Sequence, residues 1–244
     1  MKKMWKGNHA IAEAAMRAGC EFYAGYPITP QTEVGEYLSS RMPELGRRFL
    51  QAENEMSAIY MIFGAYACGM RSMTSSSGPG FSLKQEGIAY LCANNFPSVL
   101  VNVQRWGPGL GTLDSSQTDY LRDTRGGGNG DYRVIVYAPN SIQETVDLMY
   151  NAFDVAEKYR NPVEILSEAA LGQMMEPVEL PEEGESAQAD KPWPASGHQD
   201  KREHNVINSL YLTPDKLEEL VVERYKRYEQ VKAQEQRAEE YLCD

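Results

Sequence analysis

The chain has 244 residues, of which 42% are hydrophobic, and its net charge at pH 7 is −11. This content is enough to bury a sizeable core, so disorder of the whole chain is excluded, and the length fits one large domain or one domain with an appendage. The negative charge argues against binding to nucleic acid or to an anionic membrane, because both attract positively charged surfaces.

The sequence also lacks several common signatures. The four cysteines, Cys20, Cys68, Cys92 and Cys243, show no C-x-x-C spacing, and the three histidines match no common zinc pattern. The first residues lack the apolar core of a signal peptide, and no apolar run is long enough to span a bilayer. We therefore expect a reduced, cytoplasmic protein without a metal site of its own.

Short β-rich runs alternate with helical patterns up to about residue 178, which predicts a mostly parallel sheet covered by helices on both faces. Strands are expected at 21–24, 48–51, 72–75, 99–103, 134–137 and 163–166. Helices are expected at 8–18, 31–41, 54–68, 82–94 and 142–157. The last of these has the best-defined start, because Ser141 followed by Glu144 forms a capping-box pattern.

The composition changes after residue 178. Residues 179–212 are polar and rich in proline and glycine, which predicts a linker or surface arm following a domain at 1–178. Thr213 and Pro214 have the pattern of an N-cap and a first helical residue, and 213–244 is expected to form an amphipathic helix. Packing on its own domain and docking on another chain both remain open for this helix.

The first candidate site is the turn in FYAGYPITPQTE, residues 22–33. Gly25 permits unusual backbone angles, and Pro27 and Pro30 fix φ and end the strand. Thr29 is therefore expected on a stiff turn at the carboxyl end of a strand, where open α/β sheets bind ligands. An ordinary strand-to-helix turn without a binding role would show the same glycine and proline residues.

The second candidate is the pair of acids in LQAENEMSAI, since Glu53 and Glu55 stand at the first turn of a strongly apolar helix. Acids in this place often only complement the helix dipole. However, a carboxylate at the first turn of so apolar a helix could also be partly buried, and desolvation could then keep it protonated or ready to take part in catalysis.

Common phosphate-binding and hydrolase patterns are absent. Neither G-x-x-x-x-G-K-[ST] nor G-x-G-x-x-G occurs, and TSSSGPG is not a G-x-S-x-G nucleophile turn. The long, glycine-rich segment 105–133 has little periodicity but is too apolar for a plain linker. We expect it to be structured and covered by a partner.

Five stretches occur here in the same order as in the alpha subunits of 2-oxoacid:ferredoxin oxidoreductases: YPITPQTE, LQAENEMSAI, TSSSGPGFSL, VNVQRWGPGLG and GGGNGDYRVIVYAPNSIQE. The chain resembles this family over about residues 6–180, most closely the 2-oxoisovalerate (3-methyl-2-oxobutanoate) branch and next the 2-oxoglutarate branch. The resemblance implies the three-layer α/β fold of a thiamine-diphosphate enzyme, and within it the pyrimidine-binding domain.

The resemblance also implies roles for individual residues. Glu55 would be the catalytic acid that hydrogen-bonds N1′ of the cofactor's aminopyrimidine, while Glu53 would be a cap or a supporting acid. Thr29 and Arg105 would bind the 2-oxoacid, and a guanidinium suits its carboxylate because it donates two parallel hydrogen bonds. The implied cofactor-binding residues besides Glu55 are Pro27, Ile28, Ser76, Ser77 and Gly78.

The implied reaction is oxidative decarboxylation of a 2-oxoacid to an acyl-CoA, with electrons passed to ferredoxin or flavodoxin. Four dispersed cysteines cannot hold a ferredoxin-type cluster. By resemblance, a beta subunit supplies the Mg²⁺ and diphosphate site and at least one iron–sulfur cluster, and a small ferredoxin-like subunit often carries more. The chain is expected to self-associate, and in such subunits a second α/β domain follows the C-terminal helix.

Two other functions remain open on the sequence. The chain could be a noncatalytic assembly module that keeps the fold without the activity. It could also belong to a decarboxylase of sulfonate or phosphonate 2-oxoacids, which uses the same cofactor but needs no electron acceptor.

Overall fold

The computed structural model describes residues 2–184, 191–198 and 200–238. The chain forms two compact units, Met1–Ile207 and Asn208–Asp244. The first is an α/β domain, and the second contains helix α9 (Pro214–Gln234). Cys243 and the final segment 239–244 of the expected C-terminal helix lie outside the described residues.

Six parallel strands form the central sheet, in the order β3-β2-β4-β5-β7-β6. They are β2 (Phe22–Gly25), β3 (Arg48–Gln51), β4 (Ser72–Ser76), β5 (Val99–Gln104), β6 (Ile135–Tyr137) and β7 (Val163–Glu168). Every residue of β4 and β5 is buried, as expected for central strands that are covered on both faces.

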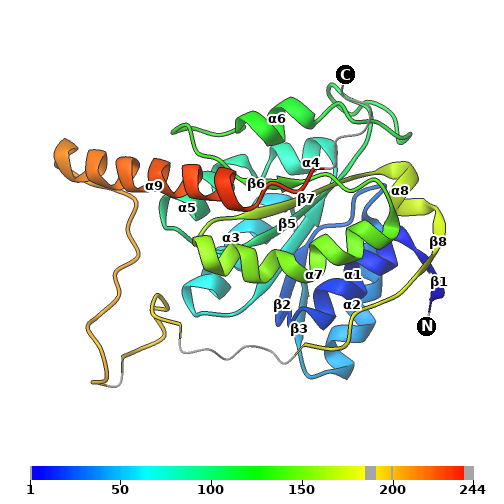
Figure 1. Ribbon diagram of the computed structural model, residues 1–244, viewed down its shortest axis with the longest axis horizontal. Coiled ribbons are helices and arrows are strands. Elements are labelled where there is room, and N and C mark those ends of the chain that lie inside the picture. Colours follow the sequence, from blue (N-terminus) through cyan, green and yellow to red (C-terminus); the bar gives the residue numbers. More distant parts are fainter. Residues whose placement is uncertain (1, 185–190, 199, 239–244) are drawn as a thin grey trace. The chain divides into compact units, whose positions relative to one another are not determined.

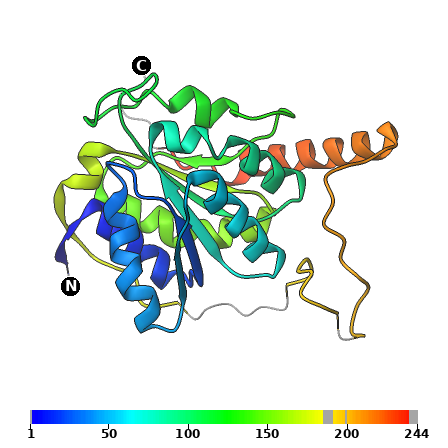
Figure 2. The same cartoon turned by 180° about the vertical axis from the view of Figure 1, so that it is seen from behind.

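Helices cover both faces of this sheet. Figure 1 shows α1 (Gly7–Arg17) and α7 (Ile142–Tyr159) in front of it, and α1 also packs on α2 (Thr32–Glu44). Figure 2 shows α3 (Glu55–Ala67) and α5 (Gln85–Ala93) in front of the opposite face. The predicted three-layer α/β class is therefore confirmed.

The six predicted strands are present within two residues of their expected bounds, but several short elements were not predicted. Strands β1 (Lys3–Lys6) and β8 (Met175–Val178) form an antiparallel pair of their own. Helix α8 (Ala169–Gln173) follows β7, and α6 (Tyr120–Arg125) lies within the long segment. Helices α6 and α8 are too short to show a helical period, and the partner of β1 lies far away in the sequence.

The helix predicted at 82–94 is wrong in its start and its continuity. The chain already turns helical at α4 (Gly78–Ser82) and continues as a separate helix α5. Pro79 stands in the first turn of α4, where its missing N–H costs no hydrogen bond. The stretch TSSSGPG has the composition of a loop, so the sequence did not predict this helical turn.

The start of α7 is as predicted. Ser141 Oγ accepts a hydrogen bond from the Glu144 N–H at 3.1 Å, while the Glu144 carboxylate accepts from the N–H of Asn140 at 2.7 Å. Thr213 likewise precedes α9 with Pro214 as the first helical residue, but the Thr213 side chain makes no capping bond.

The described parts of the predicted arm contact the α/β domain. The Arg17 guanidinium donates to Pro181 O at 2.7 Å, and the Gly184 N–H donates to Arg17 O at 2.9 Å. Lys191 forms an ion pair with Glu157 at 2.7 Å, and Trp193 packs partly buried against the core beneath α3 and α5. The domain limits at 178 and 212 stay predictions.

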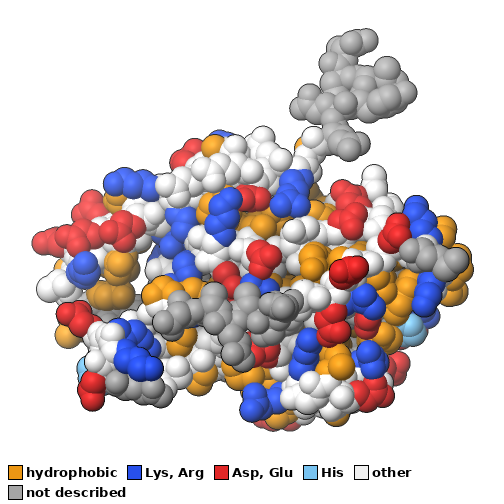
Figure 3. Space-filling model, turned by 60° about the horizontal axis from the view of Figure 1, so that its bottom comes forward, with side chains coloured by type: hydrophobic (Ala, Val, Ile, Leu, Met, Phe, Trp, Pro, Cys, Tyr) orange, Lys and Arg blue, Asp and Glu red, His pale blue; other side chains and the backbone are white. Residues whose placement is uncertain are grey.

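On the face in Figure 3, acidic and basic side chains are interspersed with hydrophobic ones and do not gather into a patch of one sign. Among the described helices, none combines the length and the apolarity needed to cross a membrane.

Candidate active site

The candidate residues lie at the carboxyl edge of the sheet, where β2, β3, β4 and β5 end. The chain leaves β2 toward its neighbour β3 on one side, and leaves β4 toward β5 on the other. The carboxyl ends of β2 and β4 therefore form a topological switch point, where open α/β sheets have a crevice for ligands.

The turn after β2 is held by buried and partly buried hydrogen bonds. Gln31 Nε2 donates to Tyr26 O at 3.0 Å, and Gln31 Oε1 accepts from Ser75 Oγ at 2.5 Å. On its other side, Asn8 Nδ2 donates to Pro30 O at 2.8 Å. The turn is thereby fixed from β4 and from α1, with Thr29 exposed at its tip.

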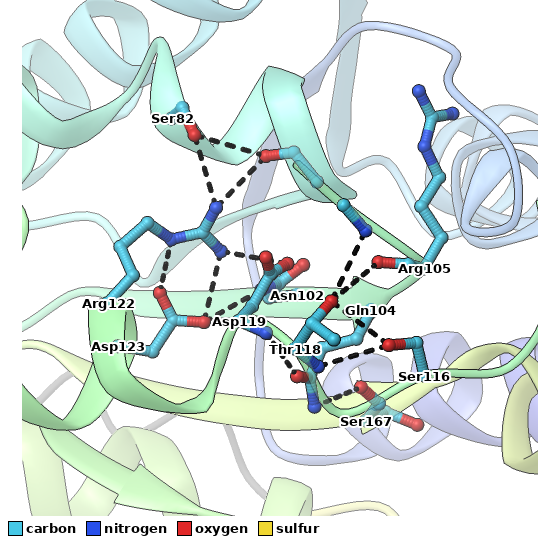
Figure 4. Close-up of polar contacts among 12 residues, drawn as sticks. Ser82, Asn102, Gln104, Arg105, Ser116, Thr118, Asp119, Arg122, Asp123 and Ser167 are labelled. Carbon is cyan, nitrogen blue, oxygen red and sulfur yellow. Dashed lines mark hydrogen bonds and ion pairs between the residues drawn. The ribbon is translucent and has the colours of Figure 1, made fainter. Parts of the chain in front are cut away.

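Arg105 connects this turn to the loop after β4. Its Nη1 donates to Thr29 O at 2.9 Å, and a Cβ at Gly78 would stand only 3.3 Å from Arg105 Nε. Arg105 is buried, and its Nε has no hydrogen-bond partner among the described residues. Figure 4 shows its guanidinium pointing away from the polar cluster around Arg122. Thr29 and Gly78 thus both lie beside Arg105, while the binding roles of these three residues stay predictions.

Glu55 is the first residue of α3 and is buried. The helix is capped by Asn54, whose Oδ1 accepts from the Ser57 N–H at 2.8 Å, whereas the exposed Glu53 accepts from Ser57 Oγ at 2.9 Å. Glu53 therefore supports the helix start from outside. Glu55 is free to face the loop after β4.

The Glu55 carboxylate lies against that loop at Gly80. A Cβ at Gly80 would stand 2.3 Å from Glu55 Oε1 and 2.5 Å from Ser76 Oγ. Only glycine leaves room for this approach. Ser76 and Ser77 are buried, and neither hydroxyl has a hydrogen-bond partner among the described residues.

Buried polar atoms without partners are costly, so they indicate groups kept for a ligand. Here a carboxylate, two hydroxyls and the Arg105 Nε stand around two glycines that allow close approach. This donor and acceptor set fits a flat polar heterocycle such as an aminopyrimidine.

Sequence reasoning missed Lys84, which lies beneath Glu55. Its Nζ donates to Thr74 Oγ1 at 2.8 Å and lies 3.5 Å from Glu55 O. Burial lowers the pKa of Lys84 to about 7, and the Glu55 carboxylate opposes this shift. A lysine inside the apolar run of GFSLKQEGIAYL was the available signal.

The long segment is structured around Arg122 of α6 (Figure 4). Its Nη1 donates to Gly78 O at 3.0 Å, its Nε pairs with Asp123 at 2.7 Å, and its Nη2 pairs with Asp119 at 3.1 Å. Asn102 of β5 donates to Asp123 at 2.8 Å. The segment is structured, as predicted, and its contacts reach the backbone of the loop after β4 at Gly78.

Beside this network lies a cavity of about 390 Å³, and Leu110 and Leu121 of the same segment are exposed. The cavity is lined by Gly78, Pro79, Ser82, Trp106, Gly107, Pro108, Gly109, Thr118, Asp119 and Arg122. Cover by a partner stays a prediction.

A second buried acid lies below the network. Glu164 of β7 contacts Asp123, and burial together with the Asp123 carboxylate raises the pKa of Glu164 well above its ordinary value. Burial and the Asp123 carboxylate thus both favour the protonated form of the Glu164 carboxyl.

Pro27 and Ile28 are placed differently from the other candidates. Pro27 lines a small cleft of about 100 Å³ between the turn after β2, α2 and β3, and Ile28 O accepts from the Gln31 N–H at 3.1 Å. No described contact joins either of them to Glu55, so their cofactor contacts stay predictions. Within the described ranges, no cluster of three or more His, Cys, Asp or Glu could hold a metal ion.

The family model described as pyruvate flavodoxin/ferredoxin oxidoreductase, thiamine diphosphate-binding, matches residues 13–240. Ketoisovalerate oxidoreductase subunit VorB of Methanothermobacter thermautotrophicus is 48% identical over 242 residues, which are 99% of this chain and 68% of VorB. 2-Oxoglutarate synthase subunit KorA of Methanocaldococcus jannaschii is 42% identical over 187 residues, which are 77% of this chain and 51% of KorA.

A similar fold occurs in the solved 2-oxoglutarate:ferredoxin oxidoreductase from Magnetococcus marinus with 2-oxoglutarate, coenzyme A and succinyl-CoA bound. The TM-score is 0.85 at 26% identity, and the match covers 97% of this chain and 46% of that chain. This chain therefore belongs to the pyruvate flavodoxin/ferredoxin oxidoreductase family, whose thiamine-diphosphate-binding domain it contains, and its resemblance to the ketoisovalerate branch is confirmed.

Proposed function

We propose that this chain binds the pyrimidine side of thiamine diphosphate and the substrate within a 2-oxoacid:ferredoxin oxidoreductase. The complex would decarboxylate a branched-chain 2-oxoacid oxidatively to its acyl-CoA and pass the electrons to ferredoxin. One observation carries the proposal: Arg105 joins the Thr29 turn to the loop of Ser76 to Gly80, and Glu55 lies against the same loop. Within the described part of the chain, the buried Ser76 and Ser77 hydroxyls and the Arg105 Nε have no hydrogen-bond partner.

Glu55 would hold a proton between its carboxylate and N1′ of the aminopyrimidine. Its place at the first residue of α3 suits this, because the helix N-terminus stabilises negative charge. Ser76 and Ser77 would donate or accept hydrogen bonds at the ring edge. The chemistry that bound thiamine diphosphate supplies is cleavage of the bond beside a carbonyl group, while the protein supplies orientation and electrostatics.

Arg105 would bind the substrate carboxylate. Its Nη1 is held by Thr29 O, which fixes the direction of the guanidinium, and its Nε is left for a ligand. Thr29 itself is exposed on the same turn, so its hydroxyl would reach the carboxylate or the carbonyl of the 2-oxoacid. Such positioning matters because small displacements of a bound substrate cost rate.

Other subunits would complete the site. A beta subunit would hold the diphosphate, Mg²⁺ and an iron–sulfur cluster, and a small ferredoxin-like subunit would carry further clusters. VorB and KorA are both named as subunits, which supports this arrangement. The cytoplasm is the expected compartment for an assembly that reduces ferredoxin or flavodoxin.

The choice of a branched-chain substrate is supported by the identity to VorB, which is higher and extends over more of the chain than the identity to KorA. Arg105 cannot distinguish one 2-oxoacid from another, because every 2-oxoacid has the same carboxylate. A pocket that distinguishes one methylene contributes only about 1–3 kcal/mol, so several 2-oxoacids would be accepted to different degrees.

The test is CoA-dependent viologen reduction by the chain assembled with its partner subunits. The substrates are 2-oxoisovalerate, 2-oxoglutarate, pyruvate and indolepyruvate. Preference for 2-oxoisovalerate supports the proposal. Preference for 2-oxoglutarate would show that the substrate is not a branched-chain 2-oxoacid. Decarboxylation without an acceptor would point to the nonoxidative alternative.

The variants Glu55→Gln and Glu53→Gln form a matched pair in the same assay. Loss of one carboxylate at residue 55 should lower kcat about 100-fold or more, as is typical for a positioned acid. The same change at the exposed Glu53 should leave kcat nearly unchanged. Full turnover by E55Q would remove the catalytic role from Glu55 and support a noncatalytic module.

A further inference from the structure

Tyr23 of β2 begins a series of buried hydrogen bonds that ends on the turn after β2. The Tyr23 hydroxyl lies 2.7 Å from the Ser75 hydroxyl of β4, and Ser75 Oγ donates to Gln31 Oε1 at 2.5 Å. Gln31 Nε2 in turn donates to the backbone oxygen of Tyr26 at 3.0 Å. The three side chains are only 2%, 0% and 1% exposed. Tyr23, Ser75 and Gln31 thus form one buried network, here called the Tyr23 network.

The donor and the acceptor of each bond in the Tyr23 network follow from one backbone atom. A carbonyl oxygen can only accept, so Tyr26 O orients the Gln31 amide with Nε2 toward itself and Oε1 toward Ser75. Ser75 donates its only hydrogen to that Oε1, and Tyr23 must therefore donate to Ser75. Burial raises the pKa of Tyr23 to about 12, so its hydroxyl keeps this proton at neutral pH.

Two glycines leave the space that the Tyr23 hydroxyl occupies. A Cβ at Gly25 would stand 2.2 Å from Tyr23 Oη, and a Cβ at Gly35 of α2 would stand 3.3 Å from it. The φ of Gly25 lies outside the left-handed region, so glycine is required there for space. The Tyr23 ring also stacks on Phe49 of β3, with 5.4 Å between the ring centroids. These contacts hold the Tyr23 hydroxyl near the carboxyl end of β2.

The turn that the Tyr23 network holds carries the exposed Thr29. The Gln31 side chain closes this turn onto Tyr26 O, and the Gln31 N–H donates to Ile28 O at 3.1 Å. Arg105 Nη1 donates to Thr29 O at 2.9 Å, so a displacement of the turn would also displace the guanidinium. A displacement of Gln31 therefore reaches both side chains that would bind the 2-oxoacid.

We propose that Tyr23 is a positioning residue for the 2-oxoacid, because it holds the Thr29 turn and the Arg105 guanidinium in place through its network. The effect on the substrate rests on the function proposed above, but the hold on the turn does not. Groups that bind a substrate must keep their geometry closely, since small displacements weaken its positioning. Loss of the Tyr23 hydroxyl should therefore weaken substrate binding without removing a residue that contacts the substrate.

The first experiment compares Tyr23→Phe with Tyr66→Phe. Tyr66 of α3 is similarly buried, and its hydroxyl donates at 2.6 Å to the backbone oxygen of Ser72, the first residue of β4. Each variant loses one buried hydrogen bond, so each should lower the folding equilibrium constant about fivefold in urea unfolding. In the assembled complex, Y23F should raise the KM for 2-oxoisovalerate about threefold to tenfold with kcat nearly unchanged, whereas Y66F should change neither. Equal KM values in Y23F and the wild type would overturn the positioning role.

Ser75→Ala tests whether Tyr23 acts through its network. The variant removes the link between Tyr23 and Gln31, so S75A should raise the KM for 2-oxoisovalerate as Y23F does. In the S75A background, the change of Tyr23 to phenylalanine should add nothing to the KM, because both substitutions break the same series of bonds. If the two effects on the KM multiplied, Tyr23 would not act through Ser75 and the proposal would fail.

Hydrogen exchange on the full chain measures the hold on the turn without reference to activity. The backbone amides of residues 26–31 should exchange about threefold to tenfold faster in Y23F and S75A, but at the wild-type rate in Y66F. Unchanged exchange in Y23F would contradict the hold on the turn. Faster exchange with an unchanged KM would contradict the role in substrate binding. If the wild-type complex converted no 2-oxoacid, the proposed function and the substrate role would fail together, while the exchange rates would still decide the hold on the turn.

Discussion

Two arginines of this chain are equally buried, at 6% exposure each, but their surroundings differ. Arg71, at the amino end of β4, donates to Glu157 at 2.7 and 3.0 Å, to Asp154 at 2.5 Å and to Ala18 O at 2.9 Å. Arg105, at the carboxyl end of β5, donates to Thr29 O, and its Nε finds no partner among the residues that the structure describes.

The difference separates structural from functional polarity. At the amino edge the Arg71 guanidinium makes hydrogen bonds through Nε, Nη1 and Nη2, and these bonds join β4 to the ends of α1 and α7. At the carboxyl edge the Ser76 and Ser77 hydroxyls and the Arg105 Nε have no hydrogen-bond partner in the described ranges. A fold tolerates such costs where a ligand can satisfy them.

The largest effect on stability is expected from Arg71→Met. Removing the guanidinium leaves Glu157 with Lys191 alone and takes the Arg71 donor away from the Ala18 carbonyl, at a cost of about 3 kcal/mol in the free energy of unfolding. Urea unfolding measures this cost. The folded fraction should keep its KM for the 2-oxoacid, and a raised KM would show that the amino edge also serves the site.

Arg105→Met should show the opposite pattern. Without the guanidinium the KM for the 2-oxoacid should rise about 100-fold, which corresponds to roughly 3 kcal/mol. The free energy of unfolding should change by less than about 1 kcal/mol, because one hydrogen bond is lost and one unpaired buried N–H is removed. Destabilisation as large as that of R71M would mean that Arg105 is structural.

Glu164→Gln tests the buried acid pair beneath α6. Because the folded state raises the pKa of Glu164, the native chain holds a proton that the unfolded chain releases above about pH 4.3. Stability of the wild type should therefore fall as pH rises from 5, by up to about 1.4 kcal/mol per pH unit, and E164Q should lack this slope. Unfolding curves at pH 5, 6 and 7 measure the difference, and parallel curves would refute it.

The smallest effects are expected at two buried serines, Ser77 and Ser98, whose hydroxyls both have no hydrogen-bond partner in the part of the chain that the structure describes. Ser77→Ala should weaken thiamine diphosphate binding to the assembled complex about threefold to tenfold, because it removes one hydrogen bond to the ligand. Ser98 directly precedes β5 at the opposite edge of the sheet, so Ser98→Ala should leave thiamine diphosphate binding unchanged. Calorimetric titration measures both, and equal affinities would exclude Ser77 from the cofactor site.

Much of the fold could be predicted because its signals are local. The strands are short apolar runs bounded by glycine, proline or polar turns, and Ser141 marks the start of α7 through bonds within one turn of helix. The turn of Thr29 and the first turn at Glu55 could be placed at strand ends for the same reason. Their common edge then followed from the parallel topology.

What could not be predicted depends on contacts between distant residues. The pairing of β1 with β8 joins residues more than a hundred positions apart, and α4 is hidden in a loop-like composition. Sequence reasoning also missed Lys84, whose relation to Glu55 exists only because α3 and the start of α5 pack together.

The sequence by itself determined the layered α/β architecture, the strand-end positions of Thr29, Glu55 and Arg105, and the family resemblance, because periodicity and turn chemistry act over a few residues. Only the tertiary structure decided which buried polar groups are satisfied. Arg71 directly precedes the buried strand β4 and Arg105 directly follows the buried strand β5, and neither position by itself shows whether the guanidinium finds partners. Hydrogen-bond partners come from other elements, so the unsatisfied atoms that mark the candidate site appear only when those elements are assembled.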